Sequence, residues 1–318
     1  MLSVHLEDGA VSVRNAARPR RPEGFSLIRM LAAGICNTDL ELKRGYYGFR
    51  GRPGHEFVGE VEESDNRTLV GKRVVGEINL SCRQCEWCAR GLGRHCPTRK
   101  VLGIVKQPGA FAESFVLPDV NLHVVPAGVS TEQAVFAEPV AAACEILDQV
   151  RIPKGSEVAV LGDGKLGLLI AQVLHAHGAK VIQFGKHPGK LGIAAAAGIE
   201  TVCNPKRLPV KAFPLVVDAS GAASGLAAAI GMTRPRGSVI MKSTIHDAVA
   251  INTAPVIVDE ITLMGSRCGR MEPALQLLRK KALRLDDMVT GTYSLEQSPV
   301  AFTHASSSGV LKILLKTK

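Results

Sequence analysis

The chain has 318 residues, which is enough for about two domains that each bury a core of their own. Hydrophobic residues make up 46% and charged residues 21%, proportions typical of a globular protein rather than a disordered one. The net charge of +10 suggests an anionic partner, but aromatic residues, which nucleic-acid-binding surfaces place among their cations, account for only 4%. We therefore expect no nucleic-acid partner.

The first part of the chain, residues 1–30, contains no continuous apolar stretch. The charged residues that interrupt it are Glu7, Asp8, Arg14, Arg18, Arg20 and Arg21. We therefore expect neither a secretory signal nor a membrane span, no membrane partner, and a cytoplasmic location. Thiols stay reduced in the cytoplasm, so clustered cysteines there hold metal more often than they form disulfides. The basic segment 14–22, "RNAARPRRP", is expected to be a solvated turn.

From about residue 20 to 125, short apolar runs alternate with Gly and Pro, which predicts an all-β module with long loops. These runs include "FSLIRMLAAGI", "FVGEVEE", "KRVVGEI", "GAFAESFVL" and "LHVVP". Within this region, four cysteines follow the spacing C-x2-C-x2-C-x7-C, namely Cys82, Cys85, Cys88 and Cys96.

Four thiolates at this spacing fill the tetrahedral coordination of a zinc ion and leave no position for water or substrate, so the predicted site is structural. An iron-sulfur cluster also takes four thiolates, but the usual ferredoxin run continues with x3-C-P, whereas Cys96 follows a gap of seven residues. Zinc is the favoured metal. The other cysteines, Cys144, Cys203 and Cys268, show no ligand spacing and are expected to be small buried residues.

From about residue 155, apolar strands alternate with helical stretches, which predicts a parallel sheet wrapped by helices. Its first strand leads into "VAVLGDGKLG", which places Gly162, Gly164 and Gly167 at G-x-G-x-x-G. The first glycine permits a tight turn, the second lets the backbone approach a pyrophosphate, and the third allows close helix packing. The chain is expected to close with a helix in "MEPALQLLRKKAL" and a strand in "VLKILLKT".

An Asp or Glu about 20 residues beyond such a turn usually binds the ribose hydroxyls of NAD. Here no carboxylate occurs between Gly164 and Ile199. The end of the second strand instead carries Gly185, Lys186, His187 and Lys190. A small residue followed by cations suits a 2′-phosphate, which favours NADP(H) over NAD(H); the alternative is that the lysines are solvated. Further expected dinucleotide contacts are Lys165, Leu166, Ser220, Ser243 and Arg267.

The ordered motifs "GICNTD", "PGHEFVGEV", the cysteine cluster, "FAEP" and the glycine-rich turn resemble the zinc-dependent medium-chain alcohol dehydrogenases. The resemblance spans nearly the whole chain. It implies an α/β protein with a GroES-like β-rich catalytic domain at 1–125, completed by 269–318, and a doubly wound Rossmann domain at 126–268. It also implies two zinc ions per chain and a homodimer or homotetramer.

By this resemblance, Cys36 and His55 are the first two ligands of a catalytic zinc, and Glu138 is the third. A Glu in "EP" is similar to the polyol, sugar and threonine dehydrogenase branch. In that branch Glu56, the residue after the His, can also enter the coordination shell.

The resemblance assigns Thr38 to relay the proton of the alcohol and Asp39 to orient the ligand His55. Glu41 stands where some family members complete the relay with a His, so the chain departs from the family there. The cleft residues implied are Tyr46, Tyr47 and Phe49, for which core packing is the alternative.

The expected activity is hydride transfer between an alcohol or carbonyl substrate (a polyol, a sugar or a secondary alcohol) and NADP(H). One alternative is a zinc-independent NADPH reductase of enones or quinones, which Cys36, His55 and Glu138 together disfavour. The other is a non-catalytic, nucleotide-sensing zinc protein. Metal content combined with NADPH formation from a panel of alcohols separates the three.

Overall fold

A computed structural model describes residues 1–243 and 248–317 of the chain. It divides into two compact units. The first unit comprises Met1–Glu138, Ala274–Arg279 and Val289–Lys318, and the second comprises Pro139–Pro273 and Lys280–Met288. The first boundary thus lies within α4 (Ala137–Gln149), beyond the expected residue 125.

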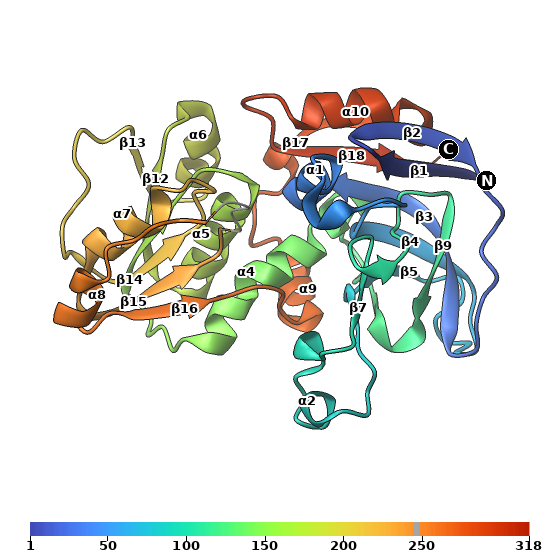
Figure 1. The fold of residues 1–318 in the computed structure, drawn as a ribbon, viewed down its shortest axis with the longest axis horizontal. Helices are drawn as coiled ribbons and strands as arrows, with labels where there is room; N and C mark the ends of the chain where they lie inside the picture. The colour runs from blue at the N-terminus through green and yellow to red at the C-terminus, as the bar shows by residue number, and fades with distance from the viewer. Residues whose placement is uncertain (244–247, 318) are drawn as a thin grey trace. The chain divides into compact units, whose positions relative to one another are not determined.

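A seven-stranded sheet forms the centre of the first unit, with the path β10-β5-β4-β3-β18-β17 and with β9 paired to β3 (Figure 1). Its strands are β3 (Phe25–Ile35), β4 (Glu56–Glu63), β5 (Arg73–Gly76), β9 (Ser114–Pro118), β10 (Leu122–Val124), β17 (Val289–Ser294) and β18 (Lys312–Lys316). The pairs are antiparallel except for β17 and β18. The long strand β3 is buried almost throughout, as its apolar sequence predicts.

Two smaller sheets complete the first unit. The hairpin of β1 (Leu2–Glu7) and β2 (Ala10–Asn15) turns at Asp8–Gly9, where both residues have positive φ, as a two-residue hairpin turn requires. A three-stranded sheet joins β6 (Asn79–Leu80), β7 (Lys100–Leu102) and β8 (Lys106–Gln107). The short helices of this unit include α1 (Asn37–Lys43), η1 (Tyr46–Gly48), α2 (Glu86–Ala89), η2 (Gly93–His95), η3 (Asp119–Asn121), α3 (Thr131–Ala134), η5 (Leu295–Gln297) and α10 (Ser298–Ala305).

The second unit contains a six-stranded parallel sheet in the order β13-β12-β11-β14-β15-β16. Its strands are β11 (Glu157–Leu161), β12 (Lys180–Gly185), β13 (Glu200–Cys203), β14 (Phe213–Asp218), β15 (Thr233–Met241) and β16 (Thr262–Gly265). The first strand, β11, lies near the centre of the sheet. β12 and β13 follow it toward one edge, and β14, β15 and β16 follow toward the other edge, which is the strand order of a dinucleotide-binding Rossmann fold. The predicted fold class, a β-rich GroES-like part and a parallel Rossmann sheet, is confirmed.

Helices cover the sheet of the second unit. α5 (Lys165–His177) packs on β11 and β12, α6 (Pro188–Ala196) on β12 and β13, and α7 (Gly225–Met232) on β14 and β15 (Figure 1). The second unit also contains α8 (Ala254–Val258) and η4 (Asp286–Met288), whereas most of α9 (Met271–Arg279) belongs to the first unit. The predicted helix in "MEPALQLLRKKAL" is α9, which ends at Arg279. No helix in the described part of the chain is long and apolar enough to cross a membrane.

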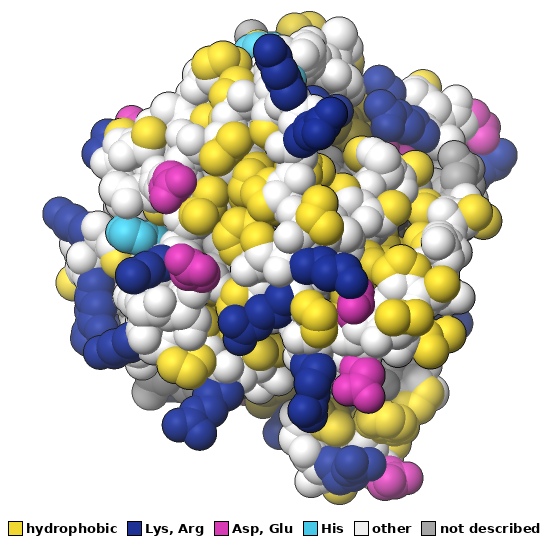
Figure 2. Space-filling model, turned by 90° about the vertical axis from the view of Figure 1, so that its left-hand side faces the viewer, with side chains coloured by type: hydrophobic (Ala, Val, Ile, Leu, Met, Phe, Trp, Pro, Cys, Tyr) yellow, Lys and Arg dark blue, Asp and Glu magenta, His cyan; other side chains and the backbone are white. Residues whose placement is uncertain are grey.

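Basic side chains outnumber acidic ones on one face of the molecule. Figure 2 looks onto the left-hand side of Figure 1, and on this face Lys and Arg cover more of the surface than Asp and Glu do. This agrees with the positive net charge of +10. Such a surface raises the local concentration of anionic ligands.

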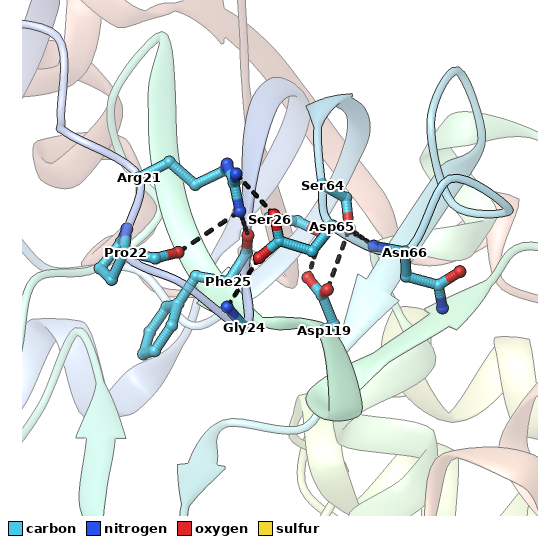
Figure 3. Close-up of polar contacts among 9 residues, drawn as sticks. All are labelled: Arg21, Pro22, Gly24, Phe25, Ser26, Ser64, Asp65, Asn66 and Asp119. Carbon is cyan, nitrogen blue, oxygen red and sulfur yellow. Dashed lines mark hydrogen bonds and ion pairs between the residues drawn. The ribbon is translucent and has the colours of Figure 1, made fainter.

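The basic segment at 14–22 is largely exposed, as expected of a solvated segment, and its first two residues end β2. Three of its arginines, Arg14, Arg18 and Arg21, form ion pairs with acidic residues. Arg21 donates to Asp65 at 2.7 Å and to the carbonyl of Phe25 at 3.0 Å, and the N–H of Gly24 donates to Asp65 at 2.9 Å (Figure 3). Beside Asp65, the hydroxyls of Ser26 and Ser64 both donate to Asp119. Arg21 and the Gly24 N–H together lower the pKa of Asp65 to about 2.

Candidate functional site

The four clustered cysteines of the first unit come together in space. Their sulfur atoms all lie within 4.8 Å of one another, with Cys85 Sγ 3.5 Å from Cys88 Sγ and 3.8 Å from Cys96 Sγ. The Cys82 N–H and the Thr98 hydroxyl lower the pKa of Cys96 to about 6, which favours the thiolate that a metal requires. Four converging sulfur atoms fit a tetrahedral zinc ion.

A second group of metal-ligand side chains forms where β3 ends and β4 begins. The ligand atoms of Cys36, His55 and Glu56 also lie within 4.8 Å of one another. The antiparallel register pairs Gly34 with Glu56, so Cys36, just after β3, lies beside His55, just before β4. His55 and Glu56 are almost completely buried.

Asp39, in the first turn of α1, organises this second group. One carboxylate oxygen accepts from the Cys36 N–H at 2.8 Å, and the other accepts from the Gly54 N–H at 3.2 Å and lies 3.5 Å from His55 Nδ1. Burial opposes a charge on the imidazole, but the nearby Asp39 carboxylate raises the pKa of His55 well above its ordinary value. Asp39 is fully buried, so its charge acts in a region from which water is excluded.

Thr38 and Glu138, two other residues expected at this site, have different positions. The Thr38 hydroxyl oxygen lies 3.8 Å from Cys36 Sγ, next to the group. Glu138 lies in the first turn of α4 and is half-buried. Among the described residues, the group of three converging ligands contains Glu56 and not Glu138.

A buried lysine, which the sequence analysis missed, binds Glu56. Lys312 Nζ on β18 contacts Glu56 Oε2 on β4, and both side chains are 1% exposed. Strand β3 lies between the two, and the pair meets over Gly34. A Cβ atom at Gly34 would lie 2.6 Å from Glu56 Oε2 and 3.0 Å from Lys312 Cδ, so only glycine leaves room for this contact. Lys312 also lies over the ring of Phe136, 5.6 Å from its centroid.

The other residues near α1 are more exposed than a core would allow. Tyr46 and Tyr47 pack against each other with ring centroids 4.1 Å apart, and Tyr47 is 68% exposed. Phe49 is half-buried. Core packing, the alternative interpretation of these aromatics, is therefore wrong for Tyr47. Glu41 forms an ion pair with Arg44 at 2.6 Å.

The glycine-rich turn of the second unit has the backbone that its sequence predicts. Gly162 has φ +113°, and a Cβ there would lie 2.4 Å from the carbonyl oxygen of Ala219. A Cβ on Gly167 would lie 2.4 Å from the carbonyl oxygen of Gly162, whereas a Cβ on Gly164, the N-cap of α5, would meet open space. Lys165 and Leu166 form the first turn of α5, whose backbone N–H groups suit a phosphate.

The later strand ends bring together some of the other expected dinucleotide contacts. Asp218, at the end of β14, accepts from the Ser220 hydroxyl at 2.7 Å, and the Ser243 hydroxyl lies 3.3 Å from the same oxygen. Arg267 follows β16, and its carbonyl accepts from the buried Lys242 at 2.9 Å. These residues lie at the carboxyl ends of their strands, where Rossmann sheets bind ligands.

The end of β12 differs from the sequence-based expectation. Gly185 ends this strand, and Lys186 and His187 follow it as exposed residues. Contrary to the expectation that no carboxylate lies here, the side chain of Asp163 packs against Gly185 and accepts from the backbone of both following residues. Asp163 lies one residue before Gly164, outside the stretch from Gly164 to Ile199 that lacks carboxylates.

The three cysteines without ligand spacing differ in burial. Cys144 is buried as expected, and burial raises the pKa of its thiol to about 12. Cys268 is half-buried. Cys203 is exposed at the end of β13, so the expectation of a buried residue is wrong there.

Two family models match the chain. The alcohol dehydrogenase GroES-like domain matches residues 22–127, and the zinc-binding dehydrogenase model matches residues 166–280. Among curated relatives, D-altritol 5-dehydrogenase of Agrobacterium fabrum is 31% identical over 77% of each chain. Sorbitol dehydrogenase of Halalkalibacterium halodurans is 29% identical over 96% of each chain.

Solved structures agree with these sequence matches over the full length. A zinc-binding dehydrogenase from Sinorhizobium meliloti, bound to NADP, has a TM-score of 0.91 at 27% identity and covers 99% of this chain and 98% of its own. The alcohol dehydrogenase of Thermus sp. ATN1 has a TM-score of 0.90 at 28% identity and covers both chains completely, at 100% each. With its cysteine cluster, its glycine-rich turn, two matching family models and relatives named as polyol dehydrogenases, the chain belongs to the zinc-dependent medium-chain alcohol dehydrogenase family and acts on CH–OH donors.

Proposed function

We propose that this enzyme transfers hydride between a secondary alcohol group of a polyol or sugar and NADP(H), and that it holds two zinc ions. The observation that carries the proposal is the convergence of Cys36, His55 and Glu56 beside the buried Asp39. A thiolate, an imidazole and a carboxylate are the mixed ligands of catalytic zinc sites, which keep one position open. The polyol substrates of the curated relatives support the substrate class.

In this proposal, Cys36 and His55 hold the catalytic zinc, with Glu138 or Glu56 as a further ligand. The bound metal supplies Lewis-acid stabilisation of the alcohol oxygen. Asp39 keeps His55 in the orientation that ligation requires, and Thr38, beside Cys36, accepts the proton of the substrate hydroxyl and passes it on. The four thiolates of Cys82, Cys85, Cys88 and Cys96 hold the second zinc, which stabilises the fold.

Lys312 limits what Glu56 can do. Its ammonium neutralises the Glu56 carboxylate inside the protein, so ligation of zinc by Glu56 must replace that ion pair. This favours Glu138 as the resting third ligand and gives Glu56 the role of an alternative ligand.

The preference for NADP(H) depends on the cations after β12. Lys186 is exposed and Lys190 is half-buried, so both can meet a 2′-phosphate. The NADP bound to the related structure from Sinorhizobium meliloti is compatible with this preference. A cytoplasmic location and a homodimeric or homotetrameric assembly complete the proposal.

Elemental analysis combined with a substrate panel tests the proposal. We expect two zinc ions per native chain and reduction of NADP⁺ with polyols such as sorbitol or D-arabitol. Cys36→Ala should keep one zinc and lose activity, whereas the matched control Cys203→Ser, at an exposed cysteine outside both groups, should keep both. One zinc per native chain, or reduction of enones without zinc, would contradict the proposal. Dinucleotide binding without turnover of any alcohol would support the sensor alternative.

A further inference from the structure

The carboxylate of Asp163 occupies a place that sequence spacing does not reveal. A Cβ atom at Gly185 would lie 2.7 Å from Cβ, Cγ and Oδ2 of Asp163. Any side chain at the end of β12 would therefore collide with Asp163. In NAD-binding folds an acid usually lies at this strand end. Here the strand ends in Gly185, and the carboxylate of Asp163 fills the space that a side chain at Gly185 would occupy.

Asp163 is fixed in this position by the residues that follow the strand. Its Oδ2 accepts from the N–H of Lys186 at 2.8 Å and from the N–H of His187 at 2.6 Å. His187 Nδ1 lies 3.0 Å from the same oxygen and 3.2 Å from Oδ1. Burial opposes the charge, but these donors keep the pKa of Asp163 below its ordinary value, so the group is a carboxylate near neutral pH.

The two oxygens of Asp163 are not equally used. Oδ2 has three donors around it, whereas among the described residues Oδ1 has only the contact with His187 at 3.2 Å. A carboxylate oxygen can accept two hydrogen bonds, so Oδ1 retains the capacity to accept from a ligand hydroxyl. Asp163 is 7% exposed, so only a ligand that lies directly on the glycine-rich turn can reach its carboxylate.

We propose that Asp163 is the ribose-binding carboxylate of this enzyme, supplied by the glycine-rich turn instead of the second strand. This rests on the proposed dehydrogenase function and deepens it. Asp163 accepts a hydroxyl of the adenosine ribose and favours NAD(H), because it repels a 2′-phosphate that carries close to two negative charges. Lys186 and Lys190 attract that phosphate, so the cofactor preference is the balance between one carboxylate and two lysines.

The first test is the substitution Asp163→Asn, with the dissociation constants of NADH and NADPH measured by fluorescence titration. The amide oxygen can still accept from the N–H groups of Lys186 and His187, but the charge is gone. We expect NADH to bind about tenfold more weakly and NADPH to bind equally well or more tightly, since one charge-assisted hydrogen bond and one repulsion are lost. The matched control is Glu200→Gln, an exposed acid at the start of β13, which should change neither constant.

A second variant separates ribose binding from a merely structural role. The double substitution Asp163→Gly with Gly185→Asp returns a carboxylate to the strand end and removes the three atoms nearest to the new Cβ. We expect the double variant to recover NADH affinity relative to Asp163→Gly alone. Gly185→Asp alone should instead weaken both cofactors, because its side chain collides with Asp163.

The outcomes distinguish this inference from the function on which it rests. An unchanged NADPH-to-NADH ratio in Asp163→Asn, or an equal loss of both cofactors, would overturn the role of Asp163 while leaving the dehydrogenase assignment intact. A native protein that binds neither dinucleotide would instead contradict the proposed function itself.

Discussion

The two groups of metal-ligand side chains differ in how the chain assembles them. The cysteine cluster comes from one short segment, 82–96, and is partly exposed, with only Cys96 fully buried. The second group combines the end of β3 with the start of β4, and its Glu56 contacts a lysine 256 residues away. The cysteine cluster is assembled within one short segment, whereas the second group forms only when β3 and β4 have paired in the sheet. We therefore expect damage to the cluster to affect stability, and damage to the second group to affect chemistry.

The largest expected effect on stability comes from the cysteine cluster. Cys85→Ser should remove a thiolate ligand and with it the folding free energy that a structural zinc supplies. Loss of such a metal costs more than about 4 kcal/mol, which corresponds to a decrease in Tm of about 10 °C for a unit of this size. Differential scanning calorimetry with zinc analysis measures it.

The control for this prediction is Cys36→Ala, which should change the Tm little while abolishing activity. A Cys85→Ser protein with native Tm but no turnover would remove the distinction between the two groups.

The ion pair of Lys312 and Glu56 gives the next largest effect. Lys312→Met leaves the Glu56 carboxylate buried without its cation, which typically costs about 3–5 kcal/mol. The double variant Lys312→Met with Glu56→Gln should recover most of this loss, because no uncompensated charge remains. Urea unfolding of the native protein and the variants measures the free energies. Equal stability of the single and double variants would show that Glu56 has another buried partner.

The role of Asp39 predicts a moderate loss of function. Asp39→Asn keeps the shape of the side chain but weakens its attraction for His55, so we expect zinc affinity and kcat/KM to fall about 10- to 100-fold. Cobalt substitution provides a second measurement, since the visible spectrum of the metal reports its ligand geometry. Asn121→Ala, a buried polar substitution outside both groups, is the control and should leave that spectrum unchanged.

Sequence reasoning predicted the features that depend on short spacing. The glycine-rich turn and the cysteine cluster follow from motifs within a few residues. The pairing of Cys36 with His55 was implied by the family resemblance, and in the structure the register of β3 and β4 brings the two together. Lys312 was missed because only the order of β4, β3 and β18, together with the missing side chain of Gly34, brings it to Glu56.

Asp163 was missed for a different reason. The usual spacing places the ribose carboxylate about 20 residues after the turn, whereas Asp163 lies within the turn itself. In the structure the space beside Gly185 is filled by a residue from the neighbouring strand's loop. At Gly185 the missing side chain leaves the space that the Asp163 carboxylate fills, and sequence spacing alone does not show this.

The ion pair of Asp65 and Arg21 lies outside both metal-ligand groups, so its acid dependence can be compared with theirs. Asp65, bound by Arg21 and the Gly24 N–H, has its pKa lowered from 3.8 to about 2 (Figure 3). Because the folded-state pKa lies below the unfolded one, the contribution of Asp65 to stability is complete above about pH 4 and is lost as the pH falls through about 2. Asp65→Asn should therefore lower the Tm slightly at pH 6 and not at all near pH 2, since the pair is partly exposed and ion pairs at the surface contribute little. Acid loss of the thiolate and imidazole ligands should begin at higher pH, where Asp65 is still charged. A Tm difference between the native protein and Asp65→Asn that grew as the pH fell would contradict this sign and would mean that Asp65 is stabilised in its protonated form.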